Sequence, residues 1–138
     1  MPCFLGIDYG GKRIGLAISD AAGRMALPLT TLQAHGTLAQ HVTAVIAAGE
    51  DFDIEAFVVG LPLNMDGTEG KQAKLARRFG TELERVAGKP VHYADERLSS
   101  HAAAELLQPA KLTRKKKKHR LDRIAAKVML QEFLDARS

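Results

Sequence analysis

The stretch from Phe4 to Asp20, FLGIDYGGKRIGLAISD, predicts a β-hairpin with a carboxylate at the end of its first strand. Gly10 and Gly11 offer a two-residue turn that tolerates positive φ, and the residues after it alternate between large apolar and small side chains, as in a strand. The same alternation places Asp8 on the face of the first strand that carries Gly6. A carboxylate beside a residue without a side chain either binds a positive group or accepts hydrogen bonds from backbone donors.

Two phosphate-binding motifs are excluded for this stretch. The segment from Gly6 to Lys12 fits the P-loop spacing G-x-x-x-x-G-K, but Arg13 stands where a Ser or Thr would hold magnesium, and a strand pattern follows where a helix is required. The glycines do not form G-x-G-x-x-G, and no helix begins here to present its N-terminus to a pyrophosphate. The hairpin is therefore not a nucleotide-binding loop.

The length of the chain fits one domain over residues 1–138. Its 138 residues are 46% hydrophobic and 26% charged, which are globular values. No apolar run approaches the roughly 18 residues of a membrane span, and no apolar leader follows a basic start. We expect a soluble cytoplasmic protein that has no membrane partner and is a monomer or a weak homodimer.

The basic residues are concentrated in one segment, 111–120 (KLTRKKKKHR), which holds seven Lys and Arg and no acid. The other thirteen Lys and Arg face sixteen Asp and Glu, so the rest of the chain has a net charge of −3 although the whole chain has +4. One basic patch on a mildly acidic domain is the electrostatic footprint of a protein that binds a phosphate backbone. With only two Tyr and five Phe, base stacking cannot contribute much to nucleic-acid binding, so we expect the protein to recognise the shape of the nucleic-acid backbone.

Apolar periodicity further along the chain predicts alternating strands and helices. The order β-β-β-α-β-α-β-α-α implies an α/β domain with a mixed five-stranded sheet, in which two crossover-linked parallel strands extend three antiparallel strands and helices cover both faces. Pro28 argues for an edge position of the third strand. After the hairpin we expect strands over 26–32, 56–59 and 91–94, a helix capped by Thr37 and ended by Gly49, a long loop over 61–70, and helices over 71–86, 101–108 and 121–135. The helices over 71–86 and 121–135 are expected to bury Leu75, Phe79, Leu83 and Val86, and Leu121, Ile124, Ala125, Val128 and Leu130, respectively.

Three acids occupy positions where a ligand is expected. Asp8 and Glu96 each follow an apolar strand at its carboxyl end, and Asp122 lies in the first turn of the last expected helix. Ala125 and Ala126 are the i+3 and i+4 neighbours of Asp122, so this acid projects from the apolar side, and the two small residues let the helix approach the sheet closely. Ligands of open α/β sheets collect outside the carboxyl ends of the strands, so the three acids can converge.

Three carboxylates in one place repel one another, and a divalent cation relieves that repulsion. Ligand sets made of oxygen alone select Mg²⁺ or Mn²⁺ over zinc. Two such ions roughly 4 Å apart would activate a water and stabilise the leaving oxygen of an in-line phosphodiester displacement. This is nuclease chemistry, and it needs no Ser, Cys or His nucleophile.

Four segments in order carry a resemblance that covers nearly the whole chain. GIDYGGKRIGLAISD, GLPLNMDGTEG, DERLSS and LDRIAAKVMLQEFLD resemble the YqgF family of pre-16S rRNA nucleases, also called Holliday junction resolvase-like proteins. The resemblance implies a ribonuclease H-like fold and a metal-dependent nuclease of rRNA maturation. Under it, Asp8 matches the family's strand-one acid, Glu96 the acid of its D-E-R motif, and Asp122 the acid of its D-x-x-A-A helix.

The resemblance also places a glycine-rich loop on Gly60 to Gly70 and a basic pair on Lys12 and Arg13. A loop over Lys115 to Lys118, just ahead of Asp122, would bring positive charge to the rim of a metal site and hold the phosphates that flank the scissile bond. This run is denser than the scattered basic residues that the resemblance implies. The residues that we expect to bind nucleic acid are Lys12, Arg13, Asn64, Arg97, Arg114, Lys115, Lys116, Lys117, Lys118 and Arg120.

Each of these residues also has a purely structural interpretation. Asp8 can accept backbone hydrogen bonds, Glu96 can pair with Arg97, and Asp122 can be an ordinary first-turn acid favoured by the helix dipole. The lysine run can be a solvated loop, and Asn64 can be a turn residue whose substrate role follows from the resemblance alone. With the three acids and the resemblance taken together, we favour metal binding.

The leading functional hypothesis is a Mg²⁺- or Mn²⁺-dependent endo- or exonuclease that acts on structured RNA, within a pre-ribosomal particle, in 5′-end maturation of pre-16S rRNA. The same site would also serve a Holliday junction resolvase-like endonuclease acting on branched DNA in recombination or repair, because two-metal hydrolysis does not depend on the sugar. A non-catalytic, RNA-binding ribosome assembly factor is the alternative outside the enzymes. A sugar-kinase-like phosphotransferase shares the opening strand-turn-strand, but such enzymes close two domains over ATP and this chain is expected to have one.

Overall fold

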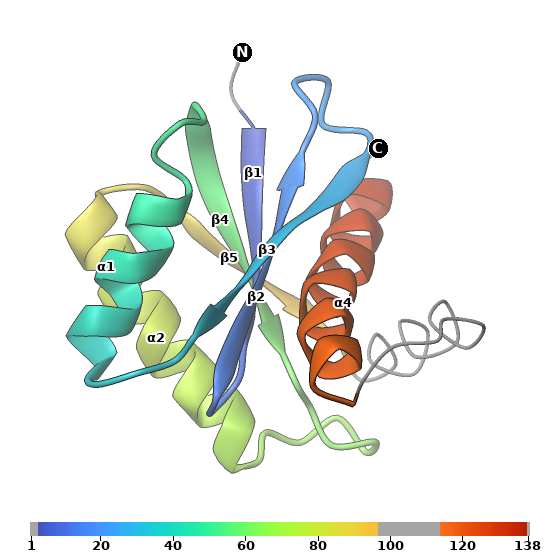
Figure 1. Ribbon diagram of the computed structural model, residues 1–138. Coiled ribbons are helices and arrows are strands. Elements are labelled where there is room, and N and C mark those ends of the chain that lie inside the picture. Colours follow the sequence, from blue (N-terminus) through green and yellow to red (C-terminus); the bar gives the residue numbers. More distant parts are fainter. Residues whose placement is uncertain (1–2, 97–113, 138) are drawn as a thin grey trace.

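Five strands form one mixed sheet in the computed structural model, which describes residues 3–96 and 114–137 and, over 114–120, the backbone (Figure 1). The strands lie in the order β3-β2-β1-β4-β5, with β1, β2 and β3 antiparallel to their neighbours in this group and β4 parallel to both β1 and β5. This is the predicted sheet of three antiparallel and two parallel strands. The strands are β1 (Cys3–Tyr9), β2 (Arg13–Ser19), β3 (Ala26–Gln33), β4 (Ile54–Leu61) and β5 (Val91–Asp95), and the helices are α1 (Leu38–Ala48), α2 (Lys71–Ala87) and α4 (Arg114–Arg137).

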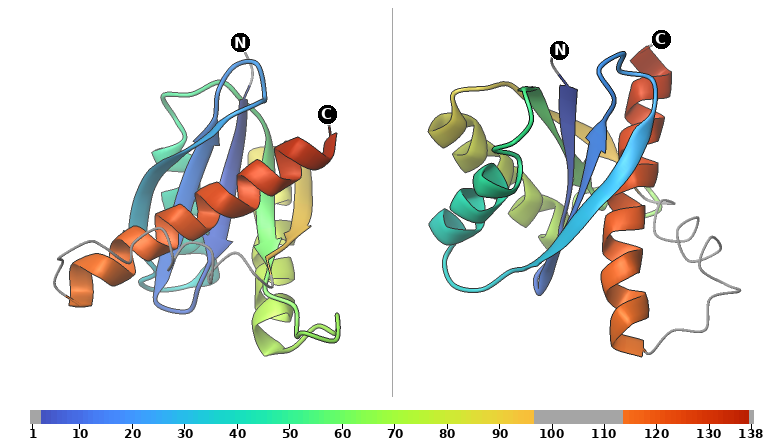
Figure 2. Two further views of the ribbon diagram at one scale, coloured as in Figure 1. Left: turned by 90° about the vertical axis from the view of Figure 1, so that its right-hand side faces the viewer. Right: turned by 45° about the horizontal axis from the view of Figure 1, so that its top comes forward.

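Helices cover both faces of the sheet, as predicted. Helices α1 and α2 lie on one face and α4 crosses the other, where it contacts β1, β2 and β3 (Figures 1 and 2). The expected helix over 101–108 lies outside the described residues. Within 3–96 and 114–137, no helix is both long and apolar enough to cross a membrane.

Alternation along the hairpin separates two hydrophobic cores. The side chains of Leu5 and Ile7 face α1 and α2, whereas Gly6 and Asp8 face α4, as the sequence pattern predicts. The core under α1 and α2 includes Leu5, Ile7, Ile14, Leu16, Val42, Val45, Phe79 and Leu83. The core under α4 includes Phe4, Ala17, Val58, Ala126, Met129, Leu130 and Leu134.

The hairpin turn differs from the prediction of two glycines with positive φ. Three residues, Gly10, Gly11 and Lys12, connect β1 to β2, and neither glycine has positive φ. The N–H of Gly10 donates to the carbonyl oxygen of Arg13 at 3.0 Å, and a Cβ on Gly10 would lie 2.8 Å from that oxygen. Glycine is needed here because the two backbones approach closely, not because of its conformational range.

The predictions for β3 and α1 are confirmed. Pro28 lies on β3, which is an edge strand, where its missing N–H costs no hydrogen bond within the sheet. Thr37 begins α1 with a capping box in which its side chain accepts from the backbone N–H of Gln40 while the Gln40 side chain accepts from the backbone N–H of Thr37. Gly49 follows the last residue of α1 as its C-cap.

The prediction of the buried face of α2 is correct in part. Phe79 and Leu83 are fully buried, but Val86 is 49% exposed. The stripe that faces the sheet runs through Ala73 and Ala76, so one turn beyond Leu83 it reaches Ala87 rather than Val86. The helix therefore packs on the sheet through more small residues than its large apolar residues indicated.

The last helix begins earlier than predicted. Helix α4 starts at Arg114 rather than near residue 121, so the run Lys115 to Lys118 belongs to its first turns and the prediction of a loop is wrong. Lys and Arg are good helix formers, and the segment contains no Gly or Pro that would stop a helix. As a consequence Asp122 lies in the third turn of α4, so the helix dipole does not explain its position.

The face of α4 that meets the sheet is also rotated relative to the prediction. Ala125 and Leu130 are buried as expected, whereas the larger residues Leu121, Ile124 and Val128 are partly exposed. Ala126 and Met129 take their place in the core. The small pair at 125 and 126 allows the close approach to the sheet that was predicted.

Candidate functional site

Asp8 and Glu96 meet at the carboxyl ends of the parallel strands. Asp8 is the next-to-last residue of β1, and Glu96 follows β5, where its N–H donates to the carbonyl oxygen of Leu61 at the end of β4 at 3.1 Å. The side chain of Glu96 lies over Gly60, where an added Cβ would overlap Glu96 Oε2. Because Gly60 has no side chain, the Glu96 carboxyl reaches across β4 to the carboxyl of Asp8, with which it shares a hydrogen bond.

The Glu96 side chain is buried and Asp8 is half-buried, and this environment sets the protonation of both carboxyl groups. Burial raises the pKa of Asp8 to about 6, with a smaller opposing effect of the hydrogen bond to Glu96 and a further rise from the charge of Asp122. Burial, and after it the charge of Asp8, raises the pKa of Glu96 to about 10. The pair therefore holds one proton at neutral pH, mainly on Glu96.

The Glu96 carboxyl has an oxygen with no partner. Glu96 is 8% exposed, and its Oε2 is buried without a hydrogen-bond partner among the described residues. An unpaired buried oxygen beside a second carboxyl is costly in the protein alone and is stabilised by a hard cation. The donor chemistry of Asp8 and Glu96 thus fits Mg²⁺ or Mn²⁺, with the cation taking the place of the shared proton.

The third predicted acid, Asp122, has its backbone close to Asp8, and its charge acts on Asp8. Its backbone lies over Gly15, where an added Cβ would overlap the Asp122 carbonyl oxygen, and Gly15 is paired with Asp8 across the hairpin. The side chain of Asp122, however, accepts a hydrogen bond from Arg13 Nε at 2.5 Å. Within residues 3–96 and 114–137, no three Asp, Glu, His or Cys side chains lie close enough to hold a metal ion together.

The residues expected to bind nucleic acid are only partly described. Lys12 is exposed in the hairpin turn, and Arg13 is 25% exposed beside Asp122. Asn64 directs its amide to Thr68 Oγ1 at 2.9 Å, so this side chain holds the loop after β4 in shape. Arg97 lies outside the described residues, and Arg114, Lys115, Lys116, Lys117, Lys118 and Arg120 are placed by their backbone in α4.

Sequence reasoning missed a polar contact that supports the end of β1 from the opposite face. The hydroxyl of Tyr9, the residue after Asp8, lies 2.6 Å from Nδ1 of His41 on α1, and the Tyr9 ring stacks on Phe79 of α2 at 4.3 Å. Alternation along β1 could have indicated that Tyr9 faces α1 and α2, but not which residues it would meet. The contact ties the strand that carries Asp8 to both helices of that face.

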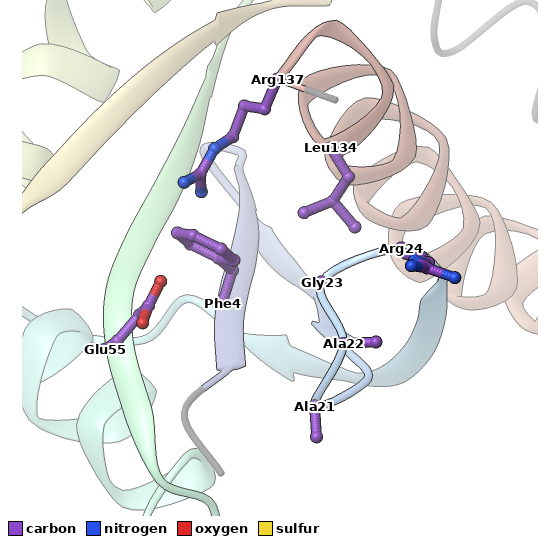
Figure 3. Close-up of a pocket in the computed structure, with 8 residues that line it drawn as sticks. All are labelled: Phe4, Ala21, Ala22, Gly23, Arg24, Glu55, Leu134 and Arg137. Carbon is purple, nitrogen blue, oxygen red and sulfur yellow. The ribbon is translucent and has the colours of Figure 1, made fainter.

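A cavity of about 350 Å³ lies at the other end of β1 (Figure 3). It is lined by Phe4, the turn over 21–24 and the end of α4, where the Arg137 guanidinium lies 4.5 Å from the centre of the Phe4 ring. Asp8 lies four positions after Phe4 on the same strand, which corresponds to roughly 13 Å of extended backbone. This cavity is therefore distinct from the carboxyl pair and contains none of the predicted site residues.

Comparison with known proteins identifies the family and agrees with the fold. The family model described as RuvX, Holliday junction resolvase, matches residues 2–136. Proteins named "Putative pre-16S rRNA nuclease" include one from Anaeromyxobacter sp. (strain K), 44% identical over 134 residues and 97% of each chain, and one from Moorella thermoacetica, 40% identical over 131 residues, 95% of this chain and 93% of the relative. The solved structure of T. thermophilus RuvC in complex with a Holliday junction substrate superposes with a TM-score of 0.60 at 17% identity, over 98% of this chain and 95% of that chain. This likeness confirms the ribonuclease H-like fold.

Proposed function

The chain belongs to the RuvX Holliday junction resolvase family, and from this membership we propose that it is a metal-dependent nuclease of structured RNA that matures the 5′ end of pre-16S rRNA. The name carried by relatives with 40–44% identity supports rRNA as the substrate. We place the activity in the cytoplasm, on a pre-ribosomal particle, and in a single domain over residues 1–138 that acts as a monomer or a weak homodimer.

The observation that carries the proposal is the buried Glu96 carboxyl, which has an unpaired oxygen and lies beside the half-buried carboxyl of Asp8. We propose that these two residues and Asp122 hold Mg²⁺ or Mn²⁺. Two such ions, when bound, activate the attacking water and stabilise the leaving oxygen of the phosphodiester. Asp8 is ionised at neutral pH and ready to bind, whereas Glu96 must release its proton first.

Basic residues near the pair are suited to hold the substrate backbone. Lys12 and Arg13 lie at the hairpin turn, next to the end of β1 that carries Asp8. From there they can contact phosphates beside the scissile bond. The backbone of Lys115 to Lys118 precedes Asp122 on α4 by about one to two turns, and we propose that these lysines add positive charge on the same side of the site. Contacts of this kind fix the register of a nucleic acid without reading its sequence.

A branched DNA is the second candidate substrate. The description of the family and the RuvC complex with a Holliday junction favour it, and hydrolysis at this site does not require a 2′-hydroxyl. The alternative of a non-catalytic assembly factor predicts binding without cleavage. One experiment distinguishes the rRNA nuclease, the branched-DNA endonuclease and the assembly factor.

That experiment is cleavage of a labelled precursor rRNA end and a labelled four-way DNA junction, side by side, with Mg²⁺, Mn²⁺ or EDTA. We expect the wild type to cut the RNA in either metal and not in EDTA. Asp8→Asn should abolish cleavage and leave RNA binding nearly intact, whereas Asp51→Asn, which changes an exposed acid in the turn after α1, should cut as the wild type does.

Each contrary outcome has a distinct meaning. Cleavage by Asp8→Asn at the wild-type rate would refute the metal site. Preference for the junction would assign the activity to DNA. Salt-sensitive binding of RNA without cleavage of either substrate would favour the assembly factor.

A further inference from the structure

An ion pair holds the third carboxylate apart from the other two. Arg13 Nε donates to Asp122 Oδ2 at 2.5 Å, and the two side chains are only 25% and 22% exposed. The residues are 109 positions apart in the sequence, so the pair joins the start of β2 to α4. A charge-assisted bond of this geometry is stronger than a neutral hydrogen bond and than a fully exposed ion pair.

The geometry gives the Asp122 side chain two alternative partners. Its backbone is seated over Gly15, which is paired with Asp8 on β1 and lies two residues after Arg13 on the same face of β2. The charge of Asp122 already acts on Asp8 from this position. Because α4 fixes the backbone of Asp122, a change of side-chain rotamer is the movement by which its carboxylate turns from Arg13 towards Asp8.

We infer that Arg13 competes with the divalent cation for Asp122. In the metal-free protein the guanidinium neutralises Asp122, and on metal binding this carboxylate turns to the cation and releases Arg13 to a phosphate of the substrate. The inference rests on the proposed metal site at Asp8, Glu96 and Asp122. It makes Arg13 a positioning residue that couples metal binding to substrate binding, since whichever ligand separates the ion pair also favours the other ligand.

The two roles of Arg13 predict opposite changes in metal affinity when Arg13 is removed. If Arg13 only held Asp122 in a productive position, its removal would weaken metal binding. If Arg13 competes, its removal tightens metal binding, because the cation no longer has to displace a guanidinium. The release of a partly buried, charge-assisted bond corresponds to about a threefold to tenfold change in Kd.

The test measures Mn²⁺ affinity by isothermal titration calorimetry on the whole chain without nucleic acid. We expect Arg13→Gln to bind Mn²⁺ about threefold to tenfold more tightly than Lys12→Gln. The control removes the same charge from the adjacent, exposed residue of the turn and so corrects for net charge. In an Asp122→Asn background, Arg13→Gln should change the affinity no more than Lys12→Gln does.

A second measurement uses the unmodified protein and does not depend on the folding of any variant. The Nε–Hε signal of Arg13 in a ¹H–¹⁵N spectrum should shift when Mg²⁺ is added, because its bond to Asp122 is broken. The signal of Arg85, whose partner Glu82 lies on the same helix, should stay in place. A structural ion pair would leave both signals unchanged.

The outcomes distinguish this inference from the proposed function. Weaker or equal Mn²⁺ binding by Arg13→Gln relative to Lys12→Gln, or an Arg13 signal that does not move at saturating Mg²⁺, would overturn the competition while the metal site stands. Absence of Mn²⁺ binding to the wild type would overturn both.

Discussion

Replacing Glu96 with Gln should stabilise the metal-free protein at alkaline pH. Glu96 is buried with one unpaired oxygen, and burial raises its pKa to about 10 from a value of 4.5 in the unfolded chain. A raised pKa means that the folded protein binds the proton more tightly than the unfolded chain does. The stability gained is complete below pH 4.5 and is lost as pH rises towards 10.

The size of the effect follows from linkage. Each pH unit between the two pKa values lowers the free energy of unfolding by at most about 1.4 kcal/mol per proton. Between pH 5 and pH 8 the limit is therefore about 4 kcal/mol, and sharing of the proton with Asp8 makes about 2–4 kcal/mol the expected loss. Gln resembles the protonated Glu in shape and can donate to Asp8, so Glu96→Gln should match the wild type at pH 5 and exceed its stability at pH 8.

Urea unfolding in EDTA at pH 5, 6, 7 and 8 measures this difference. The chain contains no Trp, so the far-ultraviolet circular dichroism of the backbone is the suitable signal. Glu50→Gln changes an exposed acid after α1 and should keep a constant offset from the wild type at all four pH values. Added Mg²⁺ should stabilise the wild type, by about 2.7 kcal/mol at 100 times Kd, and Glu96→Gln much less.

One result would refute the reasoning. If the wild type and Glu96→Gln lose stability in parallel from pH 5 to pH 8, Glu96 does not retain a proton in the fold. The Asp8 and Glu96 carboxyl groups would then not repel each other in the fold, and the main structural support for metal binding would be gone.

Four further predictions concern the elements that build the site. Gly15→Ala should lower the free energy of unfolding by at least about 2 kcal/mol and weaken Mn²⁺ binding, because the new Cβ would meet the Asp122 carbonyl oxygen; unchanged values in urea unfolding and calorimetry would contradict the close approach of α4. Met129→Ala should cost about 2–4 kcal/mol in the same unfolding assay, since this side chain is fully buried beneath α4. Thr37→Ala removes the cap of α1 and should cost about 1 kcal/mol while leaving the rate of RNA cleavage unchanged. Substitution of Lys115 to Lys118 by Gln should weaken RNA binding and reduce the slope of log K against log salt by about 0.7–0.9 for each phosphate that is no longer neutralised, and an unchanged slope would exclude these residues from the interface.

The sequence predicts well what is decided by neighbours along the chain. The faces of the hairpin, the edge position of Pro28 and the capping of α1 by Thr37 all follow from local periodicity or turn chemistry, and the structure confirms them. The start of α4 at Arg114 does not follow from the charge pattern, because charge alone does not decide between a loop and a helix. A run of four lysines suggested a solvated loop, although Lys favours a helix when nothing interrupts it.

Contacts between distant segments could not be predicted in this way. The pattern placed Asp8, Glu96 and Asp122 at one end of the sheet, but gave no sign that Asp122 would bond to Arg13, 109 residues away. Nor did it show that Gly60 leaves the space for the Glu96 carboxyl, since a glycine at a strand end is equally typical of a turn. Whether such residues meet depends on how the helices and strands pack.

The close approach of three acids at this end of the sheet lowers the stability of the metal-free protein and creates the proposed metal site. Gly60 and Gly15 make this approach possible. Gly60 admits the Glu96 carboxyl and Gly15 admits the backbone of Asp122, so three acids approach one another more closely than side chains at either position would allow. Arg13 neutralises one of these acids and a proton neutralises another, while Glu96 Oε2 remains without a partner among the described residues. Substitutions that relieve this repulsion therefore stabilise the metal-free fold and, because they remove the charge that attracts a cation, weaken metal binding. On the proposed function, the site should bind its cation best at alkaline pH, where the metal-free protein is least stable.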